Sequence, residues 1–155
     1  MEDLITWYED KELGIYFDRK PLVIVRVITP EMAAIDKKAI AKYPFQNVHR
    51  FNVTLMDYKK NKKYEFPIFK GYCYDGASVP RLLWRIIGSN TDPQFLIASL
   101  IHDALCENRN YVNNDRKFSS KVFRALLREA GVSKIKAQTM YLAVDNYQRF
   151  CRWVK

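Results

Sequence analysis

The order of patterns along the chain predicts an α+β fold, with an N-terminal antiparallel sheet packed against three or four C-terminal helices. Alternating and β-branched stretches lie within residues 1–70, whereas apolar residues recur with helical spacing after residue 79. The 155 residues, 48% of them hydrophobic, are enough for one domain with its own core. We therefore expect a single domain, 1–155, made of strands mainly in 1–70 and of a motif loop and helices in 71–155.

Four stretches of the first half are typical of strands. Residues 14–18 come first, and residues 22–28 are almost all apolar and β-branched, as in a central strand. Residues 48–57 alternate in polarity, and a lysine-rich turn joins them to 64–70, which predicts a hairpin. Pro67 removes a ladder hydrogen bond, so the second hairpin strand should lie at an edge or a bulge. The side chains expected on one face of the first hairpin strand are Phe51, Val53 and Leu55.

Helices are predicted before and after this hairpin. Residues 31–43 follow Pro30 and favour a helix, and residues 79–87 favour a short one. Asp92-Pro93 is a strong start, an N-cap followed by proline at the first helical position, for a helix over 93–106.

Two further helices should complete the chain. Asn113 or Asn114 can cap the first of them, which runs to Ala130 because a glycine follows. Ser133 should cap the last helix, at about 134–153.

The helix predicted over 93–106 carries the most informative polar residues. Apolar side chains surround it on every side, which is typical of a buried helix, yet it contains His102 and Asp103. Burying an imidazole or a carboxylate without partners costs several kcal/mol, on the order of the stability of a small domain. Both residues must therefore have partners, bind a ligand or line a cleft.

Two other carboxylates are candidate neighbours. Asp115 should face inward at the start of the next helix, because the residues three, four and seven positions later are on its mostly apolar side. The short polar connection after residue 106 would fold the two helices back on each other. Asp75 lies in a loop, 71–81, whose Asp-Gly pair indicates a turn.

These residues suggest metal-assisted chemistry. His102 would be the general base and Asp115 would orient it, while Asp103 and Asp75 would be metal ligands. This oxygen-rich set suits calcium, magnesium or manganese, and a set that includes the His102 imidazole would also suit zinc. The alternative for Asp75 and Asp115 is capping and turn chemistry, and the alternative for His102 is a core histidine with satisfied hydrogen bonds.

Two arginines one helical turn apart lie beside the proposed site. Arg81 and Arg85 could bind an anion or a partner, or could belong to a solvated helix face. His49, near the start of a predicted strand, has no acidic residue next to it and is not expected to be a catalytic or metal-binding residue. Cys73, Cys106 and Cys151 form no C-x-x-C pair and are expected to be small buried hydrophobes.

The ordered motifs resemble a small domain-of-unknown-function family common in bacteriophages and prophages. The resemblance rests on Gly71 with Asp75-Gly-Ala-Ser-Val-Pro-Arg81, on Leu-Ile-His102-Asp103, and on Asp115 opening the next helix, and it spans roughly residues 64–150. Cys106 stands where this family usually has tyrosine. The resemblance implies a phage or prophage origin, synthesis in the cytoplasm of a bacterial host and, as one role, a place in the virion.

A weaker similarity links the helical His-Asp pair to phospholipase A2-type enzymes. By that similarity His102 would be the base, Asp103 would bind calcium and Asp115 would orient the histidine. The glycine-rich calcium loop and the bracing cysteine pairs of those enzymes are not matched in this sequence.

The positive charge of the chain is concentrated in its last third. Residues 1–106 hold 15 basic and 13 acidic residues (+2), and residues 107–155 hold 11 and 4 (+7), for a total of +9. A basic surface favours nucleic acid, acidic lipid or an acidic protein as partner, and the alternative is a solvated helix face. The basic side chains of these helices are Arg116, Lys117, Lys121, Arg124, Arg128, Lys134, Lys136, Arg149 and Arg152.

Two functions remain open from the sequence. The first is a small metal-assisted hydrolase built on His102, and the second is a non-catalytic virion or assembly protein whose His-Asp cluster is a structural lock and whose basic face docks other virion proteins. DNA binding is a third. No apolar stretch approaches about 18 residues, so no transmembrane helix is expected, and the N-terminus does not have the pattern of a signal peptide.

Overall fold

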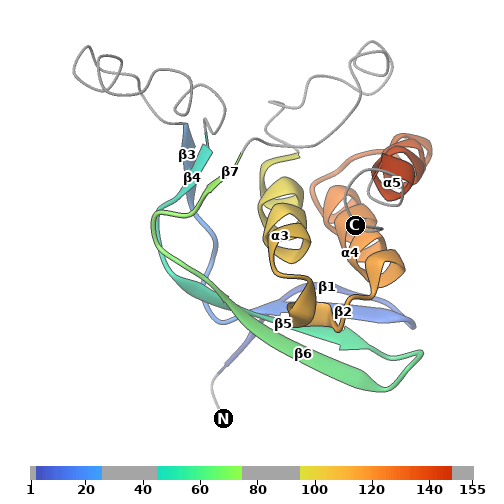
Figure 1. Ribbon diagram of the computed structural model, residues 1–155, viewed down its shortest axis with the longest axis horizontal. Coiled ribbons are helices and arrows are strands. Elements are labelled where there is room, and N and C mark those ends of the chain that lie inside the picture. The colour runs from blue at the N-terminus through green and yellow to red at the C-terminus, as the bar shows by residue number, and fades with distance from the viewer. Residues whose placement is uncertain (1–2, 26–44, 75–94, 148–155) are drawn as a thin grey trace.

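A computed structural model describes residues 3–25, 45–74 and 95–147 of the protein. These residues form an α+β fold in which helices pack on one face of an antiparallel sheet, as the sequence predicts (Figure 1). The helices predicted at 31–43 and 79–87 lie outside the described residues. Among the described residues, no helix is long and apolar enough to span a membrane.

The helices pack against one face of a four-stranded sheet. Its strands, in spatial order, are β1 (Ile5–Glu9), β2 (Leu13–Phe17), β5 (Phe51–Asp57) and β6 (Lys62–Ile68). All neighbours are antiparallel, and the predicted hairpin is confirmed as β5 and β6. β6 is the outer strand, so Pro67, opposite Asn52, stands at the edge position predicted for it.

A smaller sheet joins three short strands from distant parts of the chain. These are β3 (Val23–Val25), β4 (Phe45–Asn47) and β7 (Cys73–Tyr74), in that spatial order. β3 confirms the described part of the predicted strand at 22–28, whereas β4 and β7 are too short to be predicted from periodicity. β7 matters for the site because it packs against the first of the described helices.

Three α-helices and one 3₁₀-turn make up the described C-terminal part. They are α3 (Leu96–Glu107), η3 (Arg109–Val112), α4 (Arg116–Glu129) and α5 (Lys134–Tyr147). α3 and α4 run antiparallel side by side, joined by η3, and α5 packs on α4 (Figure 1). The predicted end of α4 is confirmed by Gly131, whose φ of +95° a glycine tolerates best. Ser133 caps α5 as predicted, since its Oγ accepts from the backbone N–H of Lys136 at 3.3 Å.

The predicted cap of α4 is wrong. Neither Asn113 nor Asn114 caps the helix; Asp115 does, accepting a hydrogen bond from the backbone N–H of Phe118 at 3.0 Å. Both asparagines instead have positive φ angles, 52° and 60°, and form the left-handed turn before the cap. Asparagine is favoured both at caps and in this conformation, so the residue type alone could not decide between them.

The core lies between the larger sheet and the helices. Phe51, Val53 and Leu55 on β5 are buried as predicted, and Thr54, on the opposite face of the strand, is buried as well. The ring of Phe66 on β6 stacks on that of Tyr111 at 4.8 Å between centroids, which fixes η3 on the sheet.

Candidate functional site

α3 is buried along most of its length, as its apolar surroundings predict. Every residue from Ala98 to Cys106 is buried, including His102 at 3% exposure and Asp103 at 6%. A polar pair at this depth has its geometry set by its neighbours rather than by solvent.

His102 is enclosed by side chains of its own helix and of α4. Its ring nitrogens lie 3.7 and 3.8 Å from the Sγ of Cys106, one turn later on α3. The Phe123 ring of α4 covers the imidazole, with 4.9 Å between centroids and a tilt of 44°. The ring is therefore held between the two helices by packing as well as by polar contacts.

Asp103 belongs to the side of α3 that Tyr72 approaches. The Tyr72 hydroxyl donates to Oε2 of Glu107 at 2.8 Å. Burial, this hydrogen bond and the nearby charges of Glu107 and Asp103 raise the pKa of Tyr72 far above its ordinary value. Tyr72 thus stays a neutral donor and ties the segment before β7 to the C-terminal end of α3.

The other predicted site residues come after β7 in the sequence. β7 ends at Tyr74 and packs against α3, and Asp75 is the next residue of the chain. Asp75, Arg81 and Arg85 lie outside the described residues, so their predicted roles stay predictions.

Asp115 takes the capping role that was the alternative to a catalytic one. One carboxylate oxygen caps α4, and the other accepts from Nζ of Lys60 at 2.7 Å. Burial acts to raise the pKa of Asp115, but the hydrogen bonds from Lys60 and from the Phe118 N–H outweigh it and lower the pKa. The His102 ring packs on Phe123, eight residues or about 12 Å farther along α4. That Asp115 orients His102 stays a prediction. Its hydrogen bonds to Lys60 and to the Phe118 N–H do not favour this role.

The described residues contain no group of three or more histidine, cysteine, aspartate or glutamate side chains placed to hold a metal ion. Asp103 and His102 are adjacent on α3, and the third ligand of the predicted set is Asp75. The predicted divalent-cation site therefore depends on a residue outside the described part.

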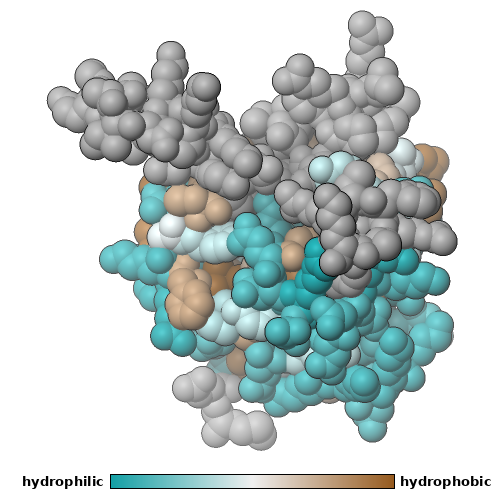
Figure 2. Space-filling view, in the orientation of Figure 1, coloured by the Kyte–Doolittle hydropathy of each residue, from teal (hydrophilic) through white to brown (hydrophobic). Residues whose placement is uncertain are grey.

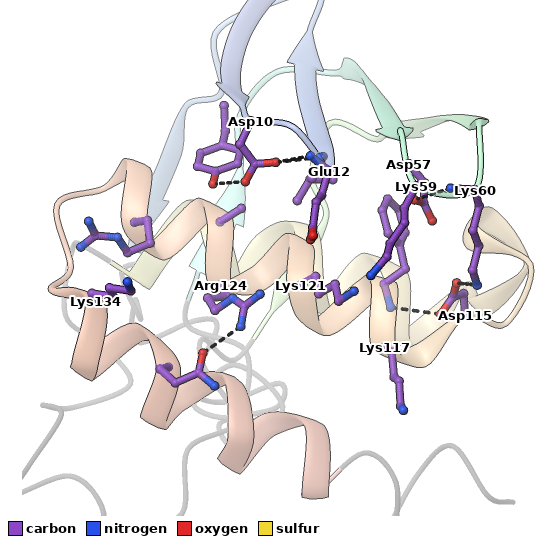
Figure 3. A pocket seen from close by; sticks show the side chains of 16 residues that line it. Asp10, Glu12, Asp57, Lys59, Lys60, Asp115, Lys117, Lys121, Arg124 and Lys134 are labelled. Carbon is purple, nitrogen blue, oxygen red and sulfur yellow. Dashed lines mark hydrogen bonds and ion pairs between the residues drawn. The ribbon is translucent and has the colours of Figure 1, made fainter.

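A basic groove lies away from the His-Asp pair. It has a volume of about 720 Å³ and runs between α4, the start of α5 and the turns of the β1–β2 and β5–β6 hairpins (Figure 3). Its seven basic residues are Lys59, Lys60, Lys117, Lys121, Arg124, Arg128 and Lys134. Its four acidic residues are Asp10, Glu12, Asp57 and Asp115, so the groove has a net charge of +3 (seven minus four).

The sequence predicted part of this groove. The last five residues of the basic set belong to the helices that were expected to present a shared basic surface. Lys59 and Lys60 come from the hairpin turn, and their lysine run was used only to place that turn. Only the packing of β5 and β6 under α4 shows that the turn and the helix face one groove.

A family model matches residues 53–144, more than half of the chain, and its description is "Protein of unknown function (DUF1353)". The chain belongs to the DUF1353 family. The matched residues include α3 with its His-Asp pair and α4 with its row of basic side chains.

One curated relative of this DUF1353 protein is "Uncharacterized protein y4jT" of Sinorhizobium fredii (strain NBRC 101917 / NGR234). The two are 37% identical over 83 residues, which is 54% of this chain. The match spans about a quarter (24%) of the length of that relative. No solved structure matches the chain.

Proposed function

We propose that the protein is a non-catalytic docking protein of a bacteriophage or prophage, acting in assembly or in the virion. In this proposal the His102–Asp103 pair is a structural lock, and the basic groove is the working surface that receives an anionic partner. The observation that carries it is the contrast between the 3% exposure of His102 and the open groove of about 720 Å³.

The enclosure of His102 supports the lock. A general base must come within about 3 Å of the proton that it removes. Phe123 and Cys106 occupy the contact distances around the His102 ring. The Phe123 contact joins α3 to α4, which supports a structural role for His102.

The phage setting rests on the similarity of the motifs in 71–81, at His102-Asp103 and at Asp115 to those common in phage and prophage proteins. Synthesis in the host cytoplasm and a place among virion proteins go with that setting.

A second candidate function is a metal-assisted hydrolase, favoured by one observation. β7, which comes just before Asp75 in the sequence, packs against α3, the helix that carries Asp103. In this alternative Asp103 and Asp75 would hold calcium, magnesium, manganese or zinc, and His102 would act as the base.

Thermal melting of the chelator-treated protein separates the two functions. Wild type, Asp103→Asn and the control Asp57→Asn are melted with calcium, magnesium, manganese and zinc in turn. Asp57 is a matched control because it is also a buried carboxylate; it ends β5 and accepts from the backbone N–H of Lys60 in the following turn.

The lock predicts that no ion raises the melting temperature of the wild type and that Asp103→Asn melts lower under every condition. An ion that raises the melting temperature of wild type and Asp57→Asn, but not of Asp103→Asn, would contradict the lock and establish the hydrolase's metal site. Saturation at a hundred times Kd stabilises by about 2.7 kcal/mol, enough to shift melting by several degrees.

A further inference from the structure

The basic side chains of α4 form a regular row along the groove. Lys117, Lys121, Arg124 and Arg128 are spaced four, three and four residues apart, so they share one face of the helix. At about 1.5 Å per residue the row extends for roughly 16 Å. Such a row matches a partner whose negative charges also repeat at short, regular intervals.

The hairpin turn and the start of α5 add further positive charge beside this row. Lys59 extends from the turn toward the side of the groove where Lys121 lies, and Lys134 stands at the other end, at the start of α5 (Figure 3). In Figure 2 the surface around the tip of the β5–β6 hairpin, at the lower right, is mainly hydrophilic. Charges on two walls suit a partner that lies in the groove.

Three of the four acidic residues of the groove are engaged within the protein. Asp10 accepts from the Tyr8 hydroxyl and from two backbone N–H groups, Asp57 from one backbone N–H, and Asp115 caps α4 and pairs with Lys60. Four lysines, in contrast, have no hydrogen-bond or ion-pair partner among the described residues. They are Lys59, Lys117, Lys121 and Lys134.

The chemistry of the lining favours phosphates over bases. Base recognition in single strands needs aromatic faces on which bases stack. Phe118 is buried, and the Tyr8 hydroxyl is held by Asp10 at 2.6 Å. The phosphates of each strand of a duplex repeat about every 3.4 Å along the helix axis, whereas carboxylates on a protein surface have no fixed spacing. The regular row on α4 therefore fits a nucleic-acid backbone better than an acidic protein.

We infer that the groove between α4 and the hairpin turns binds the phosphate backbone of double-stranded nucleic acid without reading its sequence. This inference rests on the proposed docking function and names the partner of that same surface. Lys59, Lys117, Lys121 and Lys134 make the phosphate contacts.

The test is fluorescence anisotropy with a labelled mixed-sequence DNA duplex of roughly 20 base pairs, between about 50 and 200 mM salt. Four phosphate contacts predict a slope of log K against log salt of about −3.6, that is 4 × 0.9. A second duplex of unrelated sequence should bind with the same affinity, because phosphate contacts carry no sequence information.

The variant Lys117→Gln/Lys121→Gln removes two of the contacts and keeps good helix formers. It should bind roughly a hundredfold more weakly at about 50 mM salt, and its slope should be shallower by about 1.8. The control Lys20→Gln/Lys70→Gln removes the same charge from two exposed lysines that do not line the groove, and should bind like wild type. Melting curves establish that both variants are folded.

Two results would overturn the inference. One is a groove variant that binds the duplex like the control. The other is wild type that ignores the duplex but binds labelled poly-glutamate through Lys117 and Lys121, which would make the partner an acidic protein and leave the docking function standing. Failure of the lock is distinguished from failure of this inference by the metal-dependent melting, which does not measure binding to the duplex.

Discussion

The Nζ of Lys60 lies 2.7 Å from Oδ2 of Asp115, which joins the tip of the β5–β6 hairpin to the first turn of α4. The other oxygen of the same carboxylate caps that helix. One side chain therefore sets both where α4 begins and how the hairpin tip lies against it. The two walls of the basic groove depend on this position.

Substitutions at Asp115 should separate the cap from the ion pair. Asp115→Ala loses both and should lower the free energy of unfolding by about 1–2 kcal/mol, whereas Asp115→Asn keeps a capping oxygen and should lose less. Lys60→Ala should lower the free energy of unfolding less than Asp115→Ala does, because Lys60 is largely exposed and its substitution keeps the cap intact. Urea unfolding measures all three, and equal losses for Asp115→Ala and Asp115→Asn would show that the cap contributes little.

The stability of the protein should fall in acid. Burial acts to raise the pKa values of Asp10 and Asp115, but the hydrogen bonds that each accepts lower them below the ordinary 3.8. The folded state then binds fewer protons than the unfolded state, so this stabilisation is present above about pH 4 and is lost as the pH falls through the folded pKa values.

Urea unfolding at neutral pH and at about pH 3 checks this dependence. The double variant Asp10→Asn/Asp115→Asn should lose less stability between the two conditions than wild type does. Asp3→Asn, at an exposed position, should behave like wild type. An unchanged acid dependence in the double variant would assign the loss to other carboxylates.

Arg116 and Ser120 of α4 both donate to the Asp145 carboxylate of α5. The Arg116 and Asp145 side chains are each only 17% exposed, so we expect this pair to contribute more than a surface ion pair. A double-mutant cycle of Arg116→Met and Asp145→Ala should give a coupling free energy of about 1–3 kcal/mol. A value near zero would mean that the Arg116–Asp145 pair does not help to hold α5 on α4.

His102→Ala should destabilise the protein by about 1–3 kcal/mol, because it leaves buried partners unpaired and opens space against Phe123. His49→Ala is the matched control, at a half-buried position, and should cost about 0.5 kcal/mol or less. The comparison is made by urea unfolding. A fully stable His102→Ala protein would contradict a structural role for the pair.

Local patterns predicted the parts of the fold that depend on near neighbours. The β5–β6 hairpin, the edge position of Pro67 and the all-round burial of α3 each follow from residues close in sequence. β4 and β7 have three and two residues, and their pairing joins segments some 27 residues apart, so no periodicity indicates it. β1 was missed although Ile5-Thr6-Trp7-Tyr8 is rich in strand formers.

The candidate site was predicted less well than the fold. The burial of His102 and Asp103 followed from the apolar positions around them, but the position of Asp115 depended on which of three adjacent cap formers begins the helix. The basic helix face was expected, but the groove was not, because its other lysines come from a hairpin turn and only tertiary packing brings that turn opposite the helix.

Reaction with the histidine-directed reagent diethyl pyrocarbonate tests the central claim most directly, since the chain has two histidines, His49 and His102. Peptide mass analysis gives the rate at each position in the folded protein and again in urea. A closed lock predicts rapid modification of the half-buried His49, slow modification of His102 while the protein is folded, and equal rates after unfolding. Modification of His102 in the folded protein as fast as that of His49 would contradict the lock and show an open site.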